Sequence, residues 1–329
     1  MPRIPSPESA LARMIDLFAF SSHSNAARRR YETATGVLLP RSGIETLDIL
    51  ARGPRPASEL AVALRTDPTQ SSRRVAGLVR QGFVSKKRGD GDRRRVVLAL
   101  TDRGERLVQR WQTSWLTELR RPLDTWETDD VDALTEWLRC ACTRLTPTMA
   151  KHVDSDLVTP GRTDIFSLPA TPRSEVAECL AVIADIVYLV GRADFEETLR
   201  AVDVALTAPQ YFALADIQTF GPTTVSALGG RLDLEQSTAS RSVTALHQQA
   251  LVERTPDGAD GRSRRLTVTP AGAHLLESAH QARLADLRRL FADVDAKAAA
   301  RYASLTDRYL DDLLATADVA AGRYLGAGS

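Results

Sequence analysis

Basic side chains gather on two short stretches of this sequence, and they are the residues best suited to chemistry with a partner. They are Lys86, Lys87, Arg88, Arg93, Arg94, Arg95, Arg262, Arg264 and Arg265. Clustered guanidinium and ammonium groups bind phosphate oxygens, so double-stranded DNA is the partner that this chemistry indicates. The whole chain has a net charge of only +1, because acidic residues elsewhere balance these stretches.

No pattern typical of catalysis or metal binding accompanies the basic stretches. The five histidines are scattered singly, and the three cysteines, Cys140, Cys142 and Cys179, lack zinc-ligand spacing. We therefore expect neither an enzyme nor a cofactor nor a metal site. An odd number of cysteines fits a reducing compartment, and the longest apolar stretch, around residues 180–190, is too short for a bilayer span. These features predict a cytoplasmic protein without a membrane segment.

Both basic stretches belong to an internal repeat. Shifting the chain by 168 positions aligns residues 48–107 with residues 216–275 without a gap and gives 19 identities in 60 positions. About 5 identities would arise by chance from such a composition. The two halves are therefore expected to share one fold.

Each repeat unit predicts two helices followed by a hairpin. In the first unit the helices cover residues 57–64 and a run opened by Asp67 and Pro68, a strong N-cap signal. Strands are expected at residues 83–88 and 95–101. In the second unit the corresponding helices cover residues 225–232 and 236–249, and the strands cover residues 251–256 and 263–269. This order predicts a helix-turn-helix with a β-hairpin wing.

The second helix of each unit carries side chains that suit a DNA groove. Gln70 and Arg73 are suited to base edges, and Thr69, Ser71 and Arg74 to phosphates, although the helical period places Ser71 and Ser72 on the buried face. The second unit offers Ser237, Thr238, Arg241 and Ser242 at this place. With the wing residues, the predicted DNA-binding set is Thr69, Gln70, Ser71, Arg73, Arg74, Lys86, Arg93, Arg94, Arg95, Ser237, Thr238, Arg241, Ser242, Arg262, Arg264 and Arg265.

Apolar stripes at helical spacing flank both winged units, which predicts a mainly α protein with small β-wings. We expect a first unit at residues 1–145, with its winged part at about 44–107, and a second at 175–329, with its winged part at about 212–275. Residues 146–174 contain four prolines and are expected to form the linker. The helices that end the two halves are more apolar than a small winged domain needs, so we expect an intertwined helical dimerisation layer across the halves.

Taken together, these motifs resemble the MarR family of bacterial transcription regulators. The first half shows the resemblance in Asp92-Arg93-Arg94 and in Leu100-Thr101 with Gly104. The second half shows it at least as well, in residues 206–211, in the Asp260-Gly261-Arg262 wing, and in the run from Leu266 to Gly272. Members of that family are homodimers whose terminal helices intertwine. The resemblance therefore implies a dimer fused into one chain, with Arg94 and Arg262 as wing-tip residues that enter the minor groove.

The family resemblance also implies a small aromatic effector that weakens DNA binding. In the first half its pocket would be lined by His23, Arg30, Tyr31, Trp111 and Trp115, although the two tryptophans also read as ordinary core residues. The equivalent positions of the second half are Gly191, Thr198, Leu199, Ala279 and Arg283, so two pockets would not be alike.

The charges of the two winged units differ, and the functional interpretation depends on this difference. Residues 48–107 carry a net charge of +7 and residues 216–275 a net charge of zero. We expect a sequence-specific regulator, a repressor, that acts as a monomeric pseudo-dimer on an imperfect or asymmetric operator. Two alternatives stay open: a ligand- or partner-binding module whose second unit no longer contacts DNA, and a non-specific architectural DNA binder.

Overall fold

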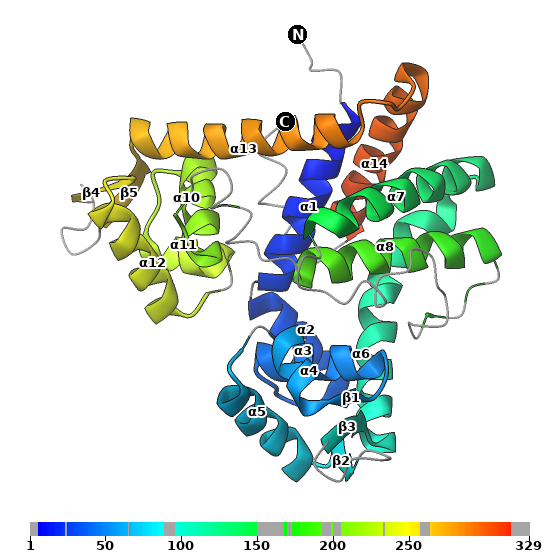
Figure 1. Cartoon of the computed structure of the whole chain (residues 1–329). Coiled ribbons are helices and arrows are strands. Elements are labelled where there is room, and N and C mark those ends of the chain that lie inside the picture. The colour runs from blue at the N-terminus through cyan, green and yellow to red at the C-terminus, as the bar shows by residue number, and fades with distance from the viewer. Residues whose placement is uncertain are drawn as a thin grey trace. The chain divides into compact units, whose positions relative to one another are not determined.

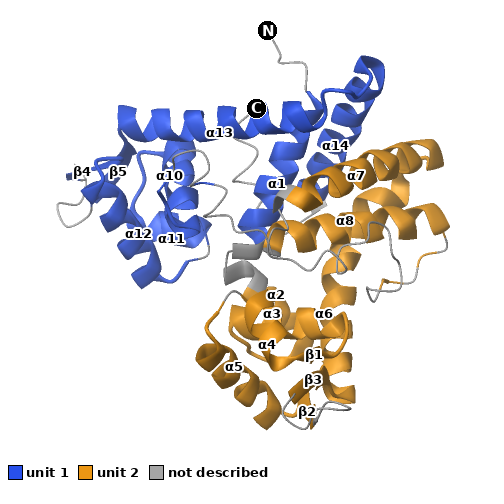
Figure 2. Cartoon of the chain, viewed as in Figure 1, with its two compact units in different colours: residues 1–27, 194–329 blue, residues 28–193 orange. Residues whose placement is uncertain are grey.

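The computed structural model describes residues 6–23, 25–64, 66–88, 96–149, 173–192, 205–232, 234–256 and 264–316, with a few single residues between them. In these ranges the chain is mainly helical and forms two small antiparallel sheets (Figure 1), which confirms the predicted fold class. The chain divides into two compact units. Unit 1 contains residues 1–27 and 194–329, and unit 2 contains residues 28–193 (Figure 2).

The elements follow the same order in both halves of the chain. The first half contains α1 (Pro7–His23), α2 (Asn25–Thr35), α3 (Arg41–Ala51), β1 (Arg55–Pro56), α4 (Ala57–Ala63), α5 (Pro68–Arg80), β2 (Val84–Arg88), β3 (Val96–Leu100), α6 (Asp102–Arg120), a 3-10 helix (Arg121–Thr125) and α7 (Thr128–Met149). The second half contains α8 (Ser174–Arg192), α10 (Ala208–Phe220), α11 (Val225–Arg231), α12 (Gln236–Gln248), β4 (Val252–Pro256), β5 (Arg264–Val268), α13 (Pro270–Leu290) and α14 (Ala296–Thr316).

The helix-turn-helix of unit 2 consists of α4 and α5, and local signals in the sequence fix its geometry. Asp67 caps α5 by accepting hydrogen bonds from the backbone N–H groups of Thr69 and Gln70, both at 2.9 Å, as the Asp-Pro signal predicts. At its other end α5 stops at Gly82, whose φ of +74° suits glycine. The wing then follows as β2 paired antiparallel with β3.

The core of this winged domain lies between α3, α5, α6 and the sheet. Leu47, Leu60, Val75, Phe83 and Leu98 are all buried in one hydrophobic cluster. Each such side chain stabilises the fold by roughly 1.5–3 kcal/mol through removal of its apolar surface from water. The recognition helix α5 is therefore held rigidly against the sheet, with its polar face left outside.

The second winged domain, in unit 1, repeats this arrangement in register. Helices α11 and α12 form its helix-turn-helix, and β4 pairs with β5 as β2 pairs with β3. Gly104 and Gly272 occupy equivalent places near the starts of α6 and α13. A Cβ at either glycine would collide with a backbone carbonyl, that of Phe83 or of Leu251 respectively, so both halves need glycine there.

The first helix of each half packs in the unit that holds the other half's winged domain (Figure 2). Helix α1 packs against α13 and α14 in unit 1, and α8 packs against α6 and α7 in unit 2. The compact units therefore differ from the consecutive halves of the sequence. Each terminal helix, α14 or α7, thus packs against the first helix of the other half.

The segment expected as a linker begins later than the sequence indicates. Helix α7 continues through Pro147 to Met149, and α8 begins at Ser174. Residues 150–167 lie outside the described part of the chain. No helix in the described ranges is both long enough and apolar enough to cross a lipid bilayer.

Candidate nucleic-acid interface

The exposed face of α5 carries most of the side chains that the sequence indicates for DNA. Thr69, Gln70 and Arg73 are exposed, and Arg74 is half-buried. The Thr66 hydroxyl donates to the Gln70 side-chain oxygen at 3.3 Å, which orients this amide at the start of the helix. Donors and acceptors on the first turns of a recognition helix are what a major groove accommodates.

The two serines Ser71 and Ser242 correct the predicted set. Ser71 is 3% exposed and Ser242 is 6% exposed, so both hydroxyls face the packed side of their helices. The structure does not support a DNA contact at these positions. Ser72 and Ser240, by contrast, are exposed, although the helical period predicted a buried Ser72. The spacing of Ser71 from Val75 and Leu78 is the signal that fixes the correct phase.

Helix α12 presents an equivalent face in the second winged domain. Ser237 and Arg241 are exposed, and Thr238 is half-buried. The Arg241 guanidinium donates to the Ser237 carbonyl and to the Thr238 hydroxyl, both at 3.3 Å. Arg241 makes no ion pair within the described residues, so its charge is available to a polyanion.

The wings place further basic side chains beside the recognition helices. Lys86 on β2 is exposed, as are Arg264 and Arg265 on β5. Arg93, Arg94, Arg95 and Arg262 lie outside the described residues.

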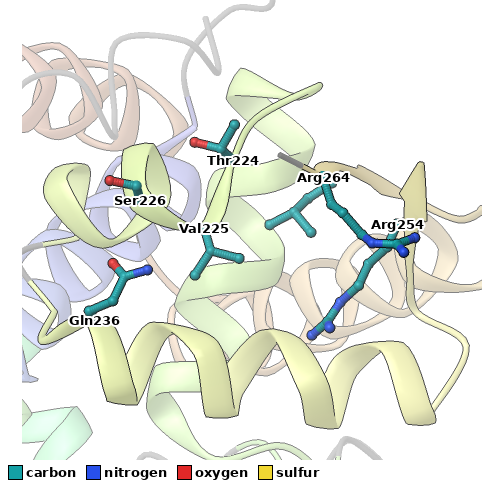
Figure 3. Close-up of a pocket in the computed structure, with 7 residues that line it drawn as sticks. Thr224, Val225, Ser226, Gln236, Arg254 and Arg264 are labelled. Carbon is teal, nitrogen blue, oxygen red and sulfur yellow. The ribbon is translucent and has the colours of Figure 1, made fainter. Parts of the chain in front are cut away.

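Arg254 on β4 is a basic residue that the sequence-based set does not contain. It corresponds to Lys86 in the repeat, which is the signal that would have found it. Its Nη2 donates to the Thr244 hydroxyl on α12 at 2.9 Å, while its buried Nε has no hydrogen-bond partner within the described residues. Figure 3 shows Arg254 reaching from the wing toward α12.

A groove next to Arg254 separates the wing from the helix-turn-helix of the second domain. Its volume is about 350 Å³, and its walls include Thr224, Gln236, Arg254 and Arg264. In Figure 3 the two arginines stand on the wing side and Gln236 at the start of α12 on the opposite side. The lining also includes the apolar residues Val225 and Leu266, but its two guanidinium groups and its lack of a carboxylate favour an anionic occupant such as a backbone phosphate.

The residues predicted to line an effector pocket are only partly brought together. Tyr31 and Trp111 lie in unit 2 with their ring centroids 5.2 Å apart, packed on the hydrophobic cluster of the winged domain. Trp115 is half-buried and Arg30 is exposed. His23 ends α1 in unit 1, and its side chain lies outside the described part.

Tyr31 has one property that matters for ligand binding. It is only 1% exposed, and its hydroxyl has no hydrogen-bond partner within the described residues. Burial, with Asp48 nearby, raises the pKa of Tyr31 above its ordinary range, so the hydroxyl keeps its proton. A buried donor without an acceptor is costly, which makes this hydroxyl a candidate for a ligand contact.

The corresponding region of unit 1 is occupied by an ion pair. Arg283, which replaces Trp115 in the repeat, pairs with Asp16 of α1 and also bonds to Tyr211 of α10. Burial lowers the pKa of Arg283, but Asp16 and Tyr211 more than offset this effect and raise the pKa above its usual value. The two regions therefore differ in chemistry, in line with the expectation that two pockets would not be alike.

The buried cysteines show no sign of redox chemistry. Burial is the main cause that raises the pKa of Cys142 and of Cys179 to about 12 in each case. Reactive thiols have a lowered pKa instead. The described residues also contain no cluster of His, Cys, Asp or Glu that would hold a metal ion.

Comparisons with known proteins agree with these features. Two models of the MarR family match the chain, one at residues 39–95 and the other at residues 206–263. An uncharacterized HTH-type transcriptional regulator, YsmB of Bacillus subtilis, is 30% identical over 125 residues, which are 38% of this chain and 82% of that protein.

Similar solved structures include two of bacterial regulators. The transcriptional regulator Tm0710 from Thermotoga maritima is 26% identical, and the match covers 31% of this chain and 70% of that one with a TM-score of 0.28. A mutant MarR from E. coli complexed with operator DNA is 28% identical, covering 31% and 72% of the respective chains with a TM-score of 0.27. With one family match in each half and a relative covered over most of its length, the chain belongs to the MarR family and carries two fused MarR units.

Proposed function

We propose that this protein is a sequence-specific DNA-binding transcription regulator, a repressor, whose two winged domains read one operator as a single-chain pseudo-dimer. The observation that carries the proposal is the pair of equivalent recognition helices. Each presents an exposed arginine, Arg73 or Arg241, one turn after a polar side chain, Gln70 or Thr238. Arginine and glutamine are side chains that discriminate bases in the major groove.

The two winged domains should recognise different half-sites. Gln70 is replaced by Thr238 and Arg74 by Ser242, which is buried. The first domain carries a net charge of +7 against zero in the second, so the first domain anchors the complex. We therefore expect an imperfect or asymmetric operator with one strongly and one weakly specified half.

A selection of bound sequences from random DNA tests this proposal. The wild-type chain should return two unlike half-sites, and Arg73→Ala should relax one half while Arg241→Ala relaxes the other. Removing a base-reading arginine in this way lowers the affinity for the selected site by about 5- to 150-fold. Arg288→Ala, an exposed arginine at the end of α13, is the control and should leave the selected sequence unchanged. A perfect palindrome would contradict the asymmetric operator.

The groove next to Arg254 supports a phosphate contact by the second domain. Arg254 and Arg264 share this groove, and neither makes an ion pair within the described residues. A DNA phosphate placed there would supply the acceptor that the Arg254 Nε lacks. These features favour a second head that contacts DNA over an idle one.

Release by a small aromatic effector is the less supported part of the proposal. The buried Tyr31 hydroxyl would donate to a ligand oxygen, and Trp111 would supply a stacking surface. Because Arg283 and Asp16 fill the equivalent region of unit 1, we expect one effector per chain. Calorimetry with a phenolic acid should then give a stoichiometry near one that Tyr31→Phe weakens. Two equal sites would contradict this proposal.

A further inference from the structure

The repeat register extends to the helices outside the winged domains, which allows charges to be compared position by position. Helix α14 begins at Ala296, 168 residues after the start of α7 at Thr128. Helices α1 and α8 are the first helices of the two halves. Residue 139 of α7 is therefore equivalent to residue 307 of α14.

In unit 1 the first helix contributes the positive charge of an interhelical ion pair. Arg13 of α1 donates to Asp307 at 3.2 Å and to Asp311 at 2.6 Å, both on α14. Arg13 and Asp307 are each 26% exposed, so water screens this cluster only in part.

In unit 2 the first helix contributes the negative charge instead. Glu178 of α8 forms an ion pair with Arg139 of α7. Arg139 holds the position that Asp307 holds in the other half, so the polarity of the helix pair is reversed between the units. Arg13 is the only arginine or lysine of α1, and α8 has no arginine or lysine before its last position, Arg192.

The reversed polarity disfavours the alternative pairing of the same helices. If α1 packed on α7, the terminal helix of a first half, Arg13 would face Arg139. If α8 packed on α14, the terminal helix of a second half, Glu178 would face Asp307. Both contacts would place like charges together where the observed arrangement has opposite ones.

Acidic side chains on the first helices act in the same direction. Asp16 of α1 pairs with Arg283, whose equivalent in the first half is Trp115. The alternative pairing would therefore leave Asp16 without its cation. A part-buried carboxylate that loses its partner is destabilising, because the cost of its partial desolvation is no longer offset.

Asp185 of α8 is a second acid whose surroundings differ between the halves. Asp185 is fully buried, and both it and Arg52 influence the Cys142 thiol, while Arg52 lies over the Tyr188 ring at 3.4 Å. In the second half, phenylalanine and leucine replace Arg52 and Cys142. In a complex of two second halves, Asp185 would therefore be buried beside these apolar side chains.

We propose that the reversed ion pairs Arg13–Asp307 and Glu178–Arg139 make the pairing of the halves heterotypic: the first helix of each half accepts only the terminal helices of the other. The matching partner of each half is thus the half to which it is fused. The pairs discriminate against association with the like half of a second copy of the chain. This pairing is a matter of assembly and does not depend on DNA binding.

The test uses the complete chain with a protease site inserted after residue 160. The purified protein is cut, unfolded in urea, refolded by dilution, and separated by native mass spectrometry. The proposal expects complexes of one N-terminal and one C-terminal fragment, at least tenfold above the like–like complexes. Statistical mixing of the fragments in the wild type would overturn it.

The variant Arg139→Asp tests the charge directly. In an N–N complex this variant gives Arg13 an acidic partner on α7. In an N–C complex it places a carboxylate opposite Glu178, which repels it. The ratio of N–N to N–C complexes should rise about tenfold, since each change between attraction and repulsion at a part-exposed site is worth a few-fold. Arg106→Asp makes the same charge change on an exposed site of α6 and should leave the ratio unchanged.

A double variant separates pairing choice from loss of folding. Arg139→Asp with Glu178→Arg restores an attractive pair in unit 2, so the uncut chain should unfold at a urea midpoint close to that of the wild type. All three fragment combinations now carry opposite charges, and both like–like complexes should rise at least tenfold. If this variant refolds only to N–C complexes, as the wild type does, the reversed ion pairs do not determine pairing and the proposal is wrong.

Discussion

At the scale of single residues, the buried thiols give a prediction about reactivity. Cys142 and Cys179 are fully buried and have a pKa of about 12, whereas Cys140 is half-exposed. At pH 8 a thiol with that pKa is ionised in only about one molecule in ten thousand, and the thiolate is the reactive form. Iodoacetamide should therefore label Cys140 in the folded protein and leave the other two unmodified.

Mass spectrometry of peptides checks this labelling pattern. In urea all three cysteines should react, which shows that burial and not sequence context protects two of them. Cys140→Ser is the matched control and should abolish labelling of the folded chain. Rapid modification of Cys179 in the folded state would instead favour the redox role that its raised pKa argues against.

The exposed and buried positions of the first recognition helix could be predicted where its phase was fixed and could not where the phase was ambiguous. The Asp67 cap was readable from the sequence because Asp-Pro acts locally. Ser71 and Ser72 are chemically identical neighbours, so only their spacing from Val75 and Leu78 distinguishes the buried one. Arg254 could have been found from its correspondence with Lys86 in the repeat, whereas its hydrogen bond to Thr244 on another element could not be read from local pattern.

At the scale of elements, the turn after each recognition helix gives a prediction about stability. Both turns are Schellman motifs. After α5, the N–H of Gly82 donates to the Val79 carbonyl and the N–H of Phe83 to the Leu78 carbonyl. After α12, the N–H of Ala250 donates to the His247 carbonyl and the N–H of Leu251 to the Leu246 carbonyl. Gly82 has a φ of +74°, but Ala250 has a φ of +56°, which is unfavourable for a residue with a Cβ. Ala250→Gly should therefore raise the free energy of unfolding of the second winged domain by about 1 kcal/mol.

Gly82→Ala is the matched opposite change in the first winged domain. A Cβ there would approach only the Arg103 guanidinium at 3.9 Å, so its cost is conformational and should again be about 1 kcal/mol. All four tryptophans lie in residues 28–193, so fluorescence in urea reports unit 2, while circular dichroism reports both units. A lower midpoint for Ala250→Gly would contradict the strain inferred at this turn.

The elements themselves were predictable, whereas the partner of each first helix was not. The recognition helices and wing strands fall within one or two residues of their predicted bounds, because caps, glycines and alternation are local signals. The apolar stripe at Leu11, Ile15 and Phe18 shows that α1 buries one face, but it does not show against which helix. That choice depends on contacts such as Arg13 with Asp307, nearly three hundred residues away along the chain.

At the scale of the whole molecule, a net charge of +1 conceals an uneven distribution. The first winged domain carries +7, the second is neutral, and the remaining segments are acidic. The first helices α1 and α8 and the terminal helix α7 each have a net negative charge, and their carboxylates form ion pairs such as Glu178 with Arg139. The charge that attracts a polyanion is therefore separate from the charge that holds the helices together.

This distribution predicts how DNA binding depends on salt. If both heads contact phosphates, replacing Arg262, Arg264 and Arg265 by alanine should flatten the slope of log K against log salt by about two to three, because each neutralised phosphate contributes about 0.9. Fluorescence anisotropy with the selected operator, in a salt series from about 50 to 300 mM, measures the slope. The control removes three exposed positive charges far from the wing, Arg288, Arg289 and Lys297, and should leave the slope unchanged.

The same titration distinguishes the alternatives for the second half. An unchanged slope in the wing variant would mean that the second head does not touch DNA, and its neutral charge and Arg254 groove would then belong to a partner-binding module. A flattened slope with equal affinity for selected and random DNA would indicate a non-specific architectural binder. We expect a flattened slope together with retained preference for the selected operator, since Gln70 and Arg73 of the first head still read bases when the second wing is neutral.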